Sequence, residues 1–255
     1  MEIIISYYGW VLLVSSLFFG LKYHSYFKSN LKLIFPYFVI NVFILLSFSA
    51  MATFRGISYD VIILFLKKNS WQLLRASYFA VVGAMLFNAV GLPIPIQPIT
   101  RILKRISQIS PKIMISIIMG HFVYTVILFA IFSLKPLSNT FMLMGMVRTI
   151  MIDASEVFIE EFTFRLFLMG LIVYLFHKLK FNEKWVVAIL ISGSFWALLH
   201  LQNPTANWIK VVQMLPLGII LGWVMKKYGF EASLFFHLIT NILMLTLLPY
   251  VLLNL

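Results

Sequence analysis

The chain has 255 residues, of which 62% are hydrophobic and only 11% are charged. A soluble domain carries roughly 25% charged residues, so the composition excludes an ordinary cytosolic enzyme and a disordered chain. The absence of cysteine excludes a secreted disulfide scaffold, zinc–thiolate sites and thiol nucleophiles. The formal net charge is +12, but the basic residues lie in short connectors between apolar runs. Membrane topology and attraction to anionic lipid explain this pattern better than binding of nucleic acid does.

Eight apolar runs follow one another along the chain, with mostly short connectors. A bilayer span needs about 20 mostly apolar residues, and continuous runs without two-residue alternation indicate helices rather than a barrel. The sequence therefore predicts an all-α, polytopic membrane protein with about eight transmembrane helices. The runs lie at residues 3–21, 31–52, 76–93, 113–133, 150–176, 186–201, 208–225 and 232–253.

Two connectors, residues 61–75 and 98–112, mix Lys and Arg with Ile, Leu and Trp. In the second one, Arg101, Lys104 and Arg105 share one face of a helix. We expect both segments to lie as helices in the plane of the lipid headgroups. Recruitment of lipid or substrate is the alternative interpretation.

Acidic residues gather in the fifth run. Of the eight acidic residues in the chain, Asp153, Glu156, Glu160 and Glu161 fall within nine positions, and Arg165 follows them. Ionisable residues inside a membrane are costly and by default mark functional sites. This helix must therefore face protein or a water-filled cavity. The alternative is that the four carboxylates only brace helices through hydrogen bonds.

Helical spacing divides this cluster. Glu160 and Glu161 are adjacent, so they point about 100° apart and cannot do the same job. Glu161 and Arg165 are spaced i,i+4, which predicts a buried ion pair. Glu156 and Glu160 share a neighbouring face by the same spacing. Glu160 is then the carboxylate without an obvious cationic partner, which suits a general base.

Two histidines stand out from the other three. His200 closes the sixth run, and His237 lies one helical turn before Asn241 on the same face of the last run. Together with Glu160 these groups suffice for hydrolysis. A carboxylate and an imidazole can deprotonate a water, while a second imidazole and a carboxamide can stabilise an oxyanion. His121, inside the fourth run, is interpreted as a hydrogen-bonded structural residue and not as a ligand.

These residues, in this order, resemble the motifs of the CPBP (CAAX protease and bacteriocin-processing, or Abi) family of intramembrane proteases. The similarity covers roughly residues 150–245. Leu166 stands where the family usually has Gly, and Trp196 stands where it usually has Phe, which concerns the shape of the substrate more than the chemistry. The three motifs read Glu160-Glu161-x-x-x-Arg165, Trp196-x-x-x-His200 and His237-x-x-x-Asn241.

Carried over by position, the resemblance assigns two pairs of residues to catalysis. Water activation falls to Glu160 and His200, and stabilisation of the oxyanion falls to His237 and Asn241. The resemblance also divides the chain into N-terminal transmembrane helices with interfacial segments, residues 1–149, and a catalytic helical core, residues 150–255. The structural support of the site consists of Glu161, Arg165 and Trp196.

A metal remains open at this point. Two His and one Glu form a catalytic zinc site with an open fourth position, so Glu160, His200 and His237 are the ligands if zinc is present. However, the sequence contains no HExxH motif, and the neutral amide of Asn241 is a poor zinc ligand. The resemblance implies a glutamate-dependent mechanism in which water is held without a metal, so no cofactor is expected.

The resemblance implies an intramembrane endopeptidase of a cell membrane, with a bacterial plasma membrane as the expected location. Its expected substrates are membrane-embedded or membrane-associated, such as leader peptides, peptide pheromones or bacteriocin-like peptides. Prenylated CAAX proteins, the substrates of the eukaryotic branch, are less expected. Two alternatives stay open: a non-catalytic membrane scaffold or bacteriocin-immunity protein of the same family, and a small transporter with a polar site at the midplane.

One conflict arises from the expected spans. The positive-inside rule places the odd-numbered connectors in the cytoplasm. At about 1.5 Å per residue, Glu160 and His200 then lie more than about 20 Å from the cytoplasmic ends of their runs, whereas His237 lies only about 10 Å from the cytoplasmic end of its run. The three residues can meet only if a span boundary is different or if the turn at residues 226–231 dips into the membrane.

Overall fold

The computed structural model describes residues 2–54, 58–96, 106–132, 146–202 and 207–253. Within these ranges every regular element is a helix, which confirms the all-α prediction. The elements are α1 (Glu2–Lys22), η1 (His24–Tyr26), α2 (Phe27–Phe54), α3 (Tyr59–Ala89), α5 (Pro111–Ile131), α7 (Met146–Glu160), η3 (Glu161–Leu168), α8 (Met169–Lys178), α9 (Lys184–Leu199), η4 (His200–Gln202), α10 (Asn207–Tyr228) and α11 (Phe230–Leu253).

Four helical stretches of the described chain are long and apolar enough to cross a membrane. The predicted number of about eight spans is therefore larger than the number that length and composition show. α9 and the last part of α1 are apolar but shorter. The four stretches are His24–Thr53, Pro111–Ile131, Trp208–Tyr228 and Phe230–Pro249.

The segment at residues 61–75 is not a separate helix. It forms the first half of α3, a single helix of 31 residues. No Pro or Gly interrupts the sequence before Gly83, so nothing breaks the helix between its polar first half and the fully buried stretch 79–87. Most of the other segment, including Arg101, Lys104 and Arg105, lies outside the described residues.

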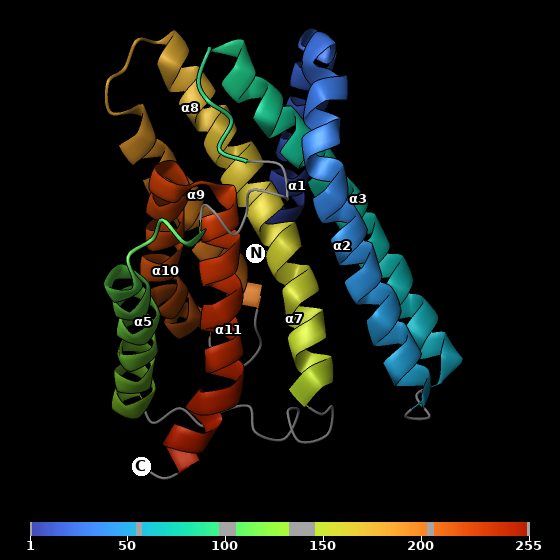
Figure 1. Ribbon diagram of the computed structural model, residues 1–255, viewed down its shortest axis with the longest axis vertical. Coiled ribbons are helices and arrows are strands. Elements are labelled where there is room, and N and C mark those ends of the chain that lie inside the picture. The colour runs from blue at the N-terminus through green and yellow to red at the C-terminus, as the bar shows by residue number, and fades with distance from the viewer. Residues whose placement is uncertain (1, 55–57, 97–105, 133–145, 203–206, 254–255) are drawn as a thin grey trace.

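α7, η3 and α8 follow one another as one long helix through the middle of the molecule (Figure 1). The pair α2–α3 lies on one side of it and α5 lies on the other. α2 packs on α3 and α7, and α3 also packs on η3 and α8. On the other side, α11 packs on α7, α5 and α10, and α10 packs on α9. The helix that carries the acidic cluster is therefore surrounded by protein.

The middle part of this long helix, η3, is a π-helix. π-helical turns are rare and frequently occur at functional sites. Seven of its eight side chains are buried. Thr163, the remaining one, donates a hydrogen bond to the carbonyl oxygen of Ile159 at 2.8 Å. The π-helix begins at Glu161, so it starts between the two adjacent glutamates of the first motif.

The turn between α10 and α11 lies inside the protein. Gly229 has a φ of 97°, which favours glycine, and the backbone N–H of Phe230 donates to the carbonyl oxygen of Pro95 at 2.7 Å. Residues 230–233 are all at most 2% exposed. Because α11 starts among other helices, His237 reaches the depth of the acidic cluster. The conflict between the expected span depths is resolved by this buried turn.

Gly83 allows α3 to approach the backbone of η3. A Cβ atom at this position would meet the carbonyl oxygen of Leu166 and lie 2.8 Å from Cα of Phe167. Backbone atoms cannot rotate away, so Gly83→Ala is expected to lower the free energy of unfolding by about 1–3 kcal/mol. Thermal unfolding of the purified protein in detergent measures the effect.

Gly120→Ala is the matched control. A Cβ atom at Gly120 meets nothing within 4 Å, and alanine is the better helix former by about 1 kcal/mol. This variant should be as stable as the parent protein or slightly more stable. Equal unfolding temperatures for Gly83→Ala and Gly120→Ala would contradict the close packing of α3 on η3.

Candidate active site

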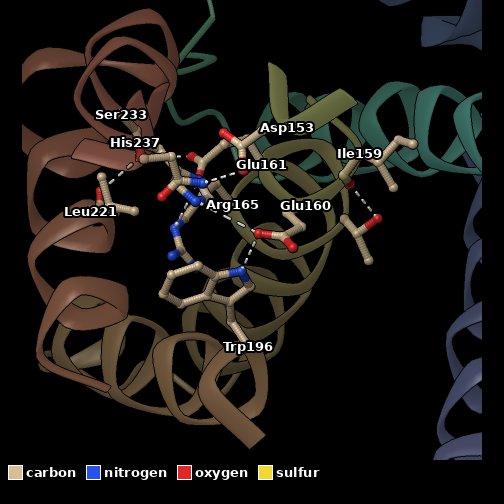
Figure 2. Close-up of polar contacts among 11 residues, drawn as sticks. Asp153, Ile159, Glu160, Glu161, Arg165, Trp196, Leu221, Ser233 and His237 are labelled. Atoms are coloured by element: carbon tan, nitrogen blue, oxygen red, sulfur yellow. Dashed lines mark hydrogen bonds and ion pairs between the residues drawn. The ribbon is translucent and has the colours of Figure 1, made fainter. Parts of the chain in front are cut away.

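Glu160, the last residue of α7, points toward α9 and α11 (Figure 2). Its Oε2 atom accepts a hydrogen bond from Nε1 of Trp196 at 2.7 Å and lies 3.7 Å from Nε2 of His237. The side chain of Glu160 is 28% exposed, whereas that of His237 is fully buried. All three motifs of the sequence therefore contribute to one site, and its carboxylate stays accessible.

Glu161 is buried and holds groups from two other parts of the chain. Its Oε1 atom lies 3.0 Å from Nδ1 of His237 and 3.6 Å from Nε of Arg165. Its Oε2 atom accepts a hydrogen bond from Oγ of Ser233 at 2.7 Å. The predicted ion pair with Arg165 is therefore present. Glu161 does more than form this pair, because it also fixes the imidazole of His237.

The two adjacent glutamates contact opposite nitrogens of the same imidazole. An ionised carboxylate can only accept hydrogen bonds, so Nδ1 of His237 donates to Glu161. Nε2 of His237 has no hydrogen-bond partner among the described residues and faces Glu160. A His237 protonated on both nitrogens can donate to both carboxylates. Glu160 is partly exposed and Glu161 is buried, which agrees with different roles for the two residues.

Trp196 lies between the two histidines of the site. Its ring centroid is 5.1 Å from that of His200 and 5.1 Å from that of His237, both in edge-to-face geometry. Nδ1 of His200 lies 3.0 Å from the carbonyl oxygen of Trp196, which accepts the hydrogen bond. Nε2 of His200 is then the nitrogen that can accept a proton. The guanidinium of Arg165 lies 5.2 Å from the Trp196 ring centroid, so one indole contacts several members of the site.

Asn241 is oriented by a residue of the acidic cluster. Its Nδ2 atom donates to Oδ1 of Asp153 on α7 at 3.1 Å. A carboxamide has two N–H groups, so one remains for another acceptor. Nothing in the sequence linked Asp153 to Asn241, because the two positions are 88 residues apart.

A cavity of about 190 Å³ lies among α5, α7, α10 and α11. Of the four residues predicted to be catalytic, Glu160, His200 and Asn241 line it. His237 lies behind Glu160 and does not line the cavity in the described structure. The lining also contains polar residues without a predicted catalytic role: His121, Asp153, Glu156, Lys210 and Gln213.

His121 differs from its interpretation as a hydrogen-bonded structural residue. Its Nδ1 atom has no hydrogen-bond partner among the described residues, and its side chain lines the cavity. Its position inside an otherwise apolar run was the feature of the sequence that could have marked it as a functional residue. Lys210 and Gln213 carry a weaker signal, since a spacing of three places them on one face of α10.

The three side chains predicted as zinc ligands do not form a metal site as they stand. Among the described residues, no group of three or more His, Asp or Glu side chains has an arrangement that could hold a metal ion. Glu160 instead accepts a hydrogen bond from Trp196. Each of the two histidines, His200 and His237, packs against the ring of Trp196.

Comparison with known proteins supports the three motifs. Residues 142–243 match the family model described as type II CAAX prenyl endopeptidase Rce1-like. The matched range includes every motif residue from Glu160 to Asn241. No curated protein and no solved structure matches the chain. The resemblance to the CPBP family is thus confirmed, and residues 142–243 are similar to the Rce1-like family of the CAAX protease type.

Proposed function

We propose that the protein is an intramembrane endopeptidase that hydrolyses peptide bonds of membrane-associated proteins or peptides. The family match supports a function of the CAAX protease type. The single observation that carries the proposal is the cavity at the end of α7. There the accessible carboxylate of Glu160 meets an imidazole, His200, and a carboxamide, Asn241, from two other parts of the chain.

The reaction needs only a water and these side chains. A water in the cavity can donate one hydrogen bond to Glu160 and another to Nε2 of His200. Glu160 takes a proton as the water oxygen attacks the carbonyl carbon of the peptide. The C–N bond then breaks, and the leaving nitrogen receives the proton from Glu160. The products are a carboxylate and an amine, and the route requires no cofactor.

The proposed donors to the oxyanion are His237 and Asn241. Asn241 keeps one N–H besides the one that is bonded to Asp153. His237 can donate from Nε2 only when both of its nitrogens carry protons and Glu160 moves aside, because Nδ1 is held by Glu161 and Nε2 faces Glu160 behind the cavity lining. One preorganised donor of this kind contributes about 10²–10³ in kcat. The residues that position these groups are Glu161, Arg165 and Trp196.

The apolar helices and the family match indicate a multi-pass membrane protein. We propose the bacterial plasma membrane as its location. Its substrates are proposed to be leader peptides, peptide pheromones, bacteriocin-like peptides or other membrane-associated proteins. The second proposed partner of the protein is the lipid bilayer that surrounds its helices.

Comparative peptidomics of cells tests the proposed function. Cells with the intact protein should release peptides that are missing from cells with His200→Ala. His24→Ala is the control, because His24 is exposed and remote from the cavity; its peptide set should equal that of the intact protein. Identical peptide sets in all three strains, at equal protein levels, would contradict a peptidase and favour a non-catalytic scaffold.

A further inference from the structure

The wall of the cavity formed by α5 and α10 carries buried polar atoms that have no use in the proposed hydrolysis. Gln213 is 2% exposed and His121 is 4% exposed. Nε2 of Gln213 donates to Oγ1 of Thr125 at 3.3 Å, so Oε1 remains. Neither this Oε1 nor Nδ1 of His121 has a hydrogen-bond partner among the described residues. A buried polar atom without a partner is destabilising, and these two line a cavity that can admit a partner.

The wall formed by α7 adds further acceptors. Oδ1 of Asp153 is bonded to Asn241, but Oδ2 is buried without a hydrogen-bond partner among the described residues. Glu156 lies one helical turn before Glu160, lines the same cavity and is exposed. Acceptors on both walls therefore surround one space, in which Lys210 carries the single ammonium group among the described lining residues.

The charges of the lining point to a cation. Three carboxylates, Asp153, Glu156 and Glu160, share the cavity with the single ammonium group of Lys210. With neutral histidines, three negative charges and one positive charge leave a formal charge of −2. A cation with N–H donors would both partly neutralise this negative charge and donate hydrogen bonds to the acceptors that have no partner.

We infer that the cavity beside Glu160 binds the cationic side chain of an Arg or Lys residue of the substrate, next to the peptide bond that is cut. This inference rests on the proposed function. A guanidinium has five N–H donors and no acceptor, which matches Oε1 of Gln213, Oδ2 of Asp153 and the carboxylate of Glu156. Pockets for drug-sized ligands measure about 300–1,000 Å³, so a cavity of about 190 Å³ suits one side chain.

Equilibrium binding tests the inference without the need for turnover. The probes are short palmitoylated, fluorescent peptides of Leu and Ala with one Arg, each paired with the same peptide containing neutral citrulline. The full chain is placed in phosphatidylcholine nanodiscs. A charge-assisted hydrogen bond contributes about 10-fold or more in affinity, so the Arg peptide should bind at least about 10-fold more tightly than the citrulline peptide.

Two variants locate this preference in the cavity. Gln213→Leu removes an acceptor and should reduce the ratio of Arg to citrulline affinity by about 10-fold. Gln72→Leu, the same substitution on α3 away from the cavity, should leave the ratio unchanged. Glu156→Lys reverses one charge and should make a peptide with Glu bind more tightly than the Arg peptide.

Two results would overturn the inference. One is equal binding of the Arg and citrulline peptides by the unmodified protein. The other is tighter binding of a peptide with Glu, which would assign Lys210 the role of holding an anionic substrate group. Cleavage of the same peptides is recorded in parallel with Glu160→Gln. Binding decides the cation subsite and cleavage decides the peptidase, so each proposal can fail alone.

Discussion

Replacement of Glu160 by Gln is expected to lower kcat for peptide cleavage by about 10²–10⁴-fold, the usual contribution of a general base. The amide oxygen of Gln can still accept the hydrogen bond from Nε1 of Trp196, which is 2.7 Å long in the parent protein. The fold and the position of the side chain should therefore persist, while the ability to take a proton from water is lost. The measurement is kcat on a peptide that the peptidomics experiment identifies.

The control for this prediction is Asp60→Asn, which removes a carboxylate from an exposed position at the start of α3. This variant should keep the parent kcat. Thermal unfolding of both variants separates a loss of chemistry from a loss of folded protein. A folded Glu160→Gln protein with parent activity would show that Glu160 is not the base.

Glu161→Leu is expected to act mainly on stability, and strongly. Arg165 is fully buried, and none of its three guanidinium nitrogens has a hydrogen-bond partner among the described residues. Its ion pair with Glu161 is therefore the main compensation for the buried charge. Removal of one member of a buried ion pair costs about 3–5 kcal/mol, because the other charge stays unpaired. The free energy of unfolding in detergent measures this loss.

A double-mutant cycle identifies the cause. Glu161→Leu combined with Arg165→Met removes both charges, so the double variant should be more stable than Glu161→Leu alone. Glu183→Leu, at an exposed position before α9, should change stability by less than about 0.5 kcal/mol. If Glu161→Leu were as stable as Glu183→Leu, the buried pair would have no structural importance.

The grouping of Glu160, His200, His237 and Asn241 is a prediction from three short motifs on three apolar runs; the structure brings Glu160, His200 and Asn241 to one cavity, with His237 next to Glu160. Local spacing was equally informative for Glu161 and Arg165, since an i,i+4 pair depends only on helix geometry. The first prediction rests on the resemblance to a family, and the second rests on the geometry of a helix.

The depth of His237 could not be derived from hydropathy. The start of α11 was expected at a membrane boundary, but Phe230 at this start is fully buried and bonds to Pro95. Hydropathy reports which residues avoid water and does not distinguish lipid from protein as their surroundings. The continuity of residues 61–75 with the buried half of α3 also could not be derived from hydropathy, because the two halves differ in polarity.

The wall of the cavity formed by α5 and α10 was not predicted either. Gln213 reaches Thr125 across 88 positions, and His121 approaches the acidic cluster from a helix outside the family match. No periodicity connects such distant positions, and only the packing of α5 on α11 and α10 brings them together. Even so, a buried histidine in an apolar run was a signal that could have been weighed more heavily.

The π-helix of η3 makes the number of residues in this stretch matter as much as their identity. Deletion of one residue between Glu161 and Leu168 would let the backbone return to regular α-helical bonding. The residues of η3 would then change their directions relative to Glu160, whereas α8 would keep nearly its present face, because a π-helical turn holds one residue more than an α-helical turn. Length variation is therefore expected to be rejected here, even at positions whose side chains never approach the substrate.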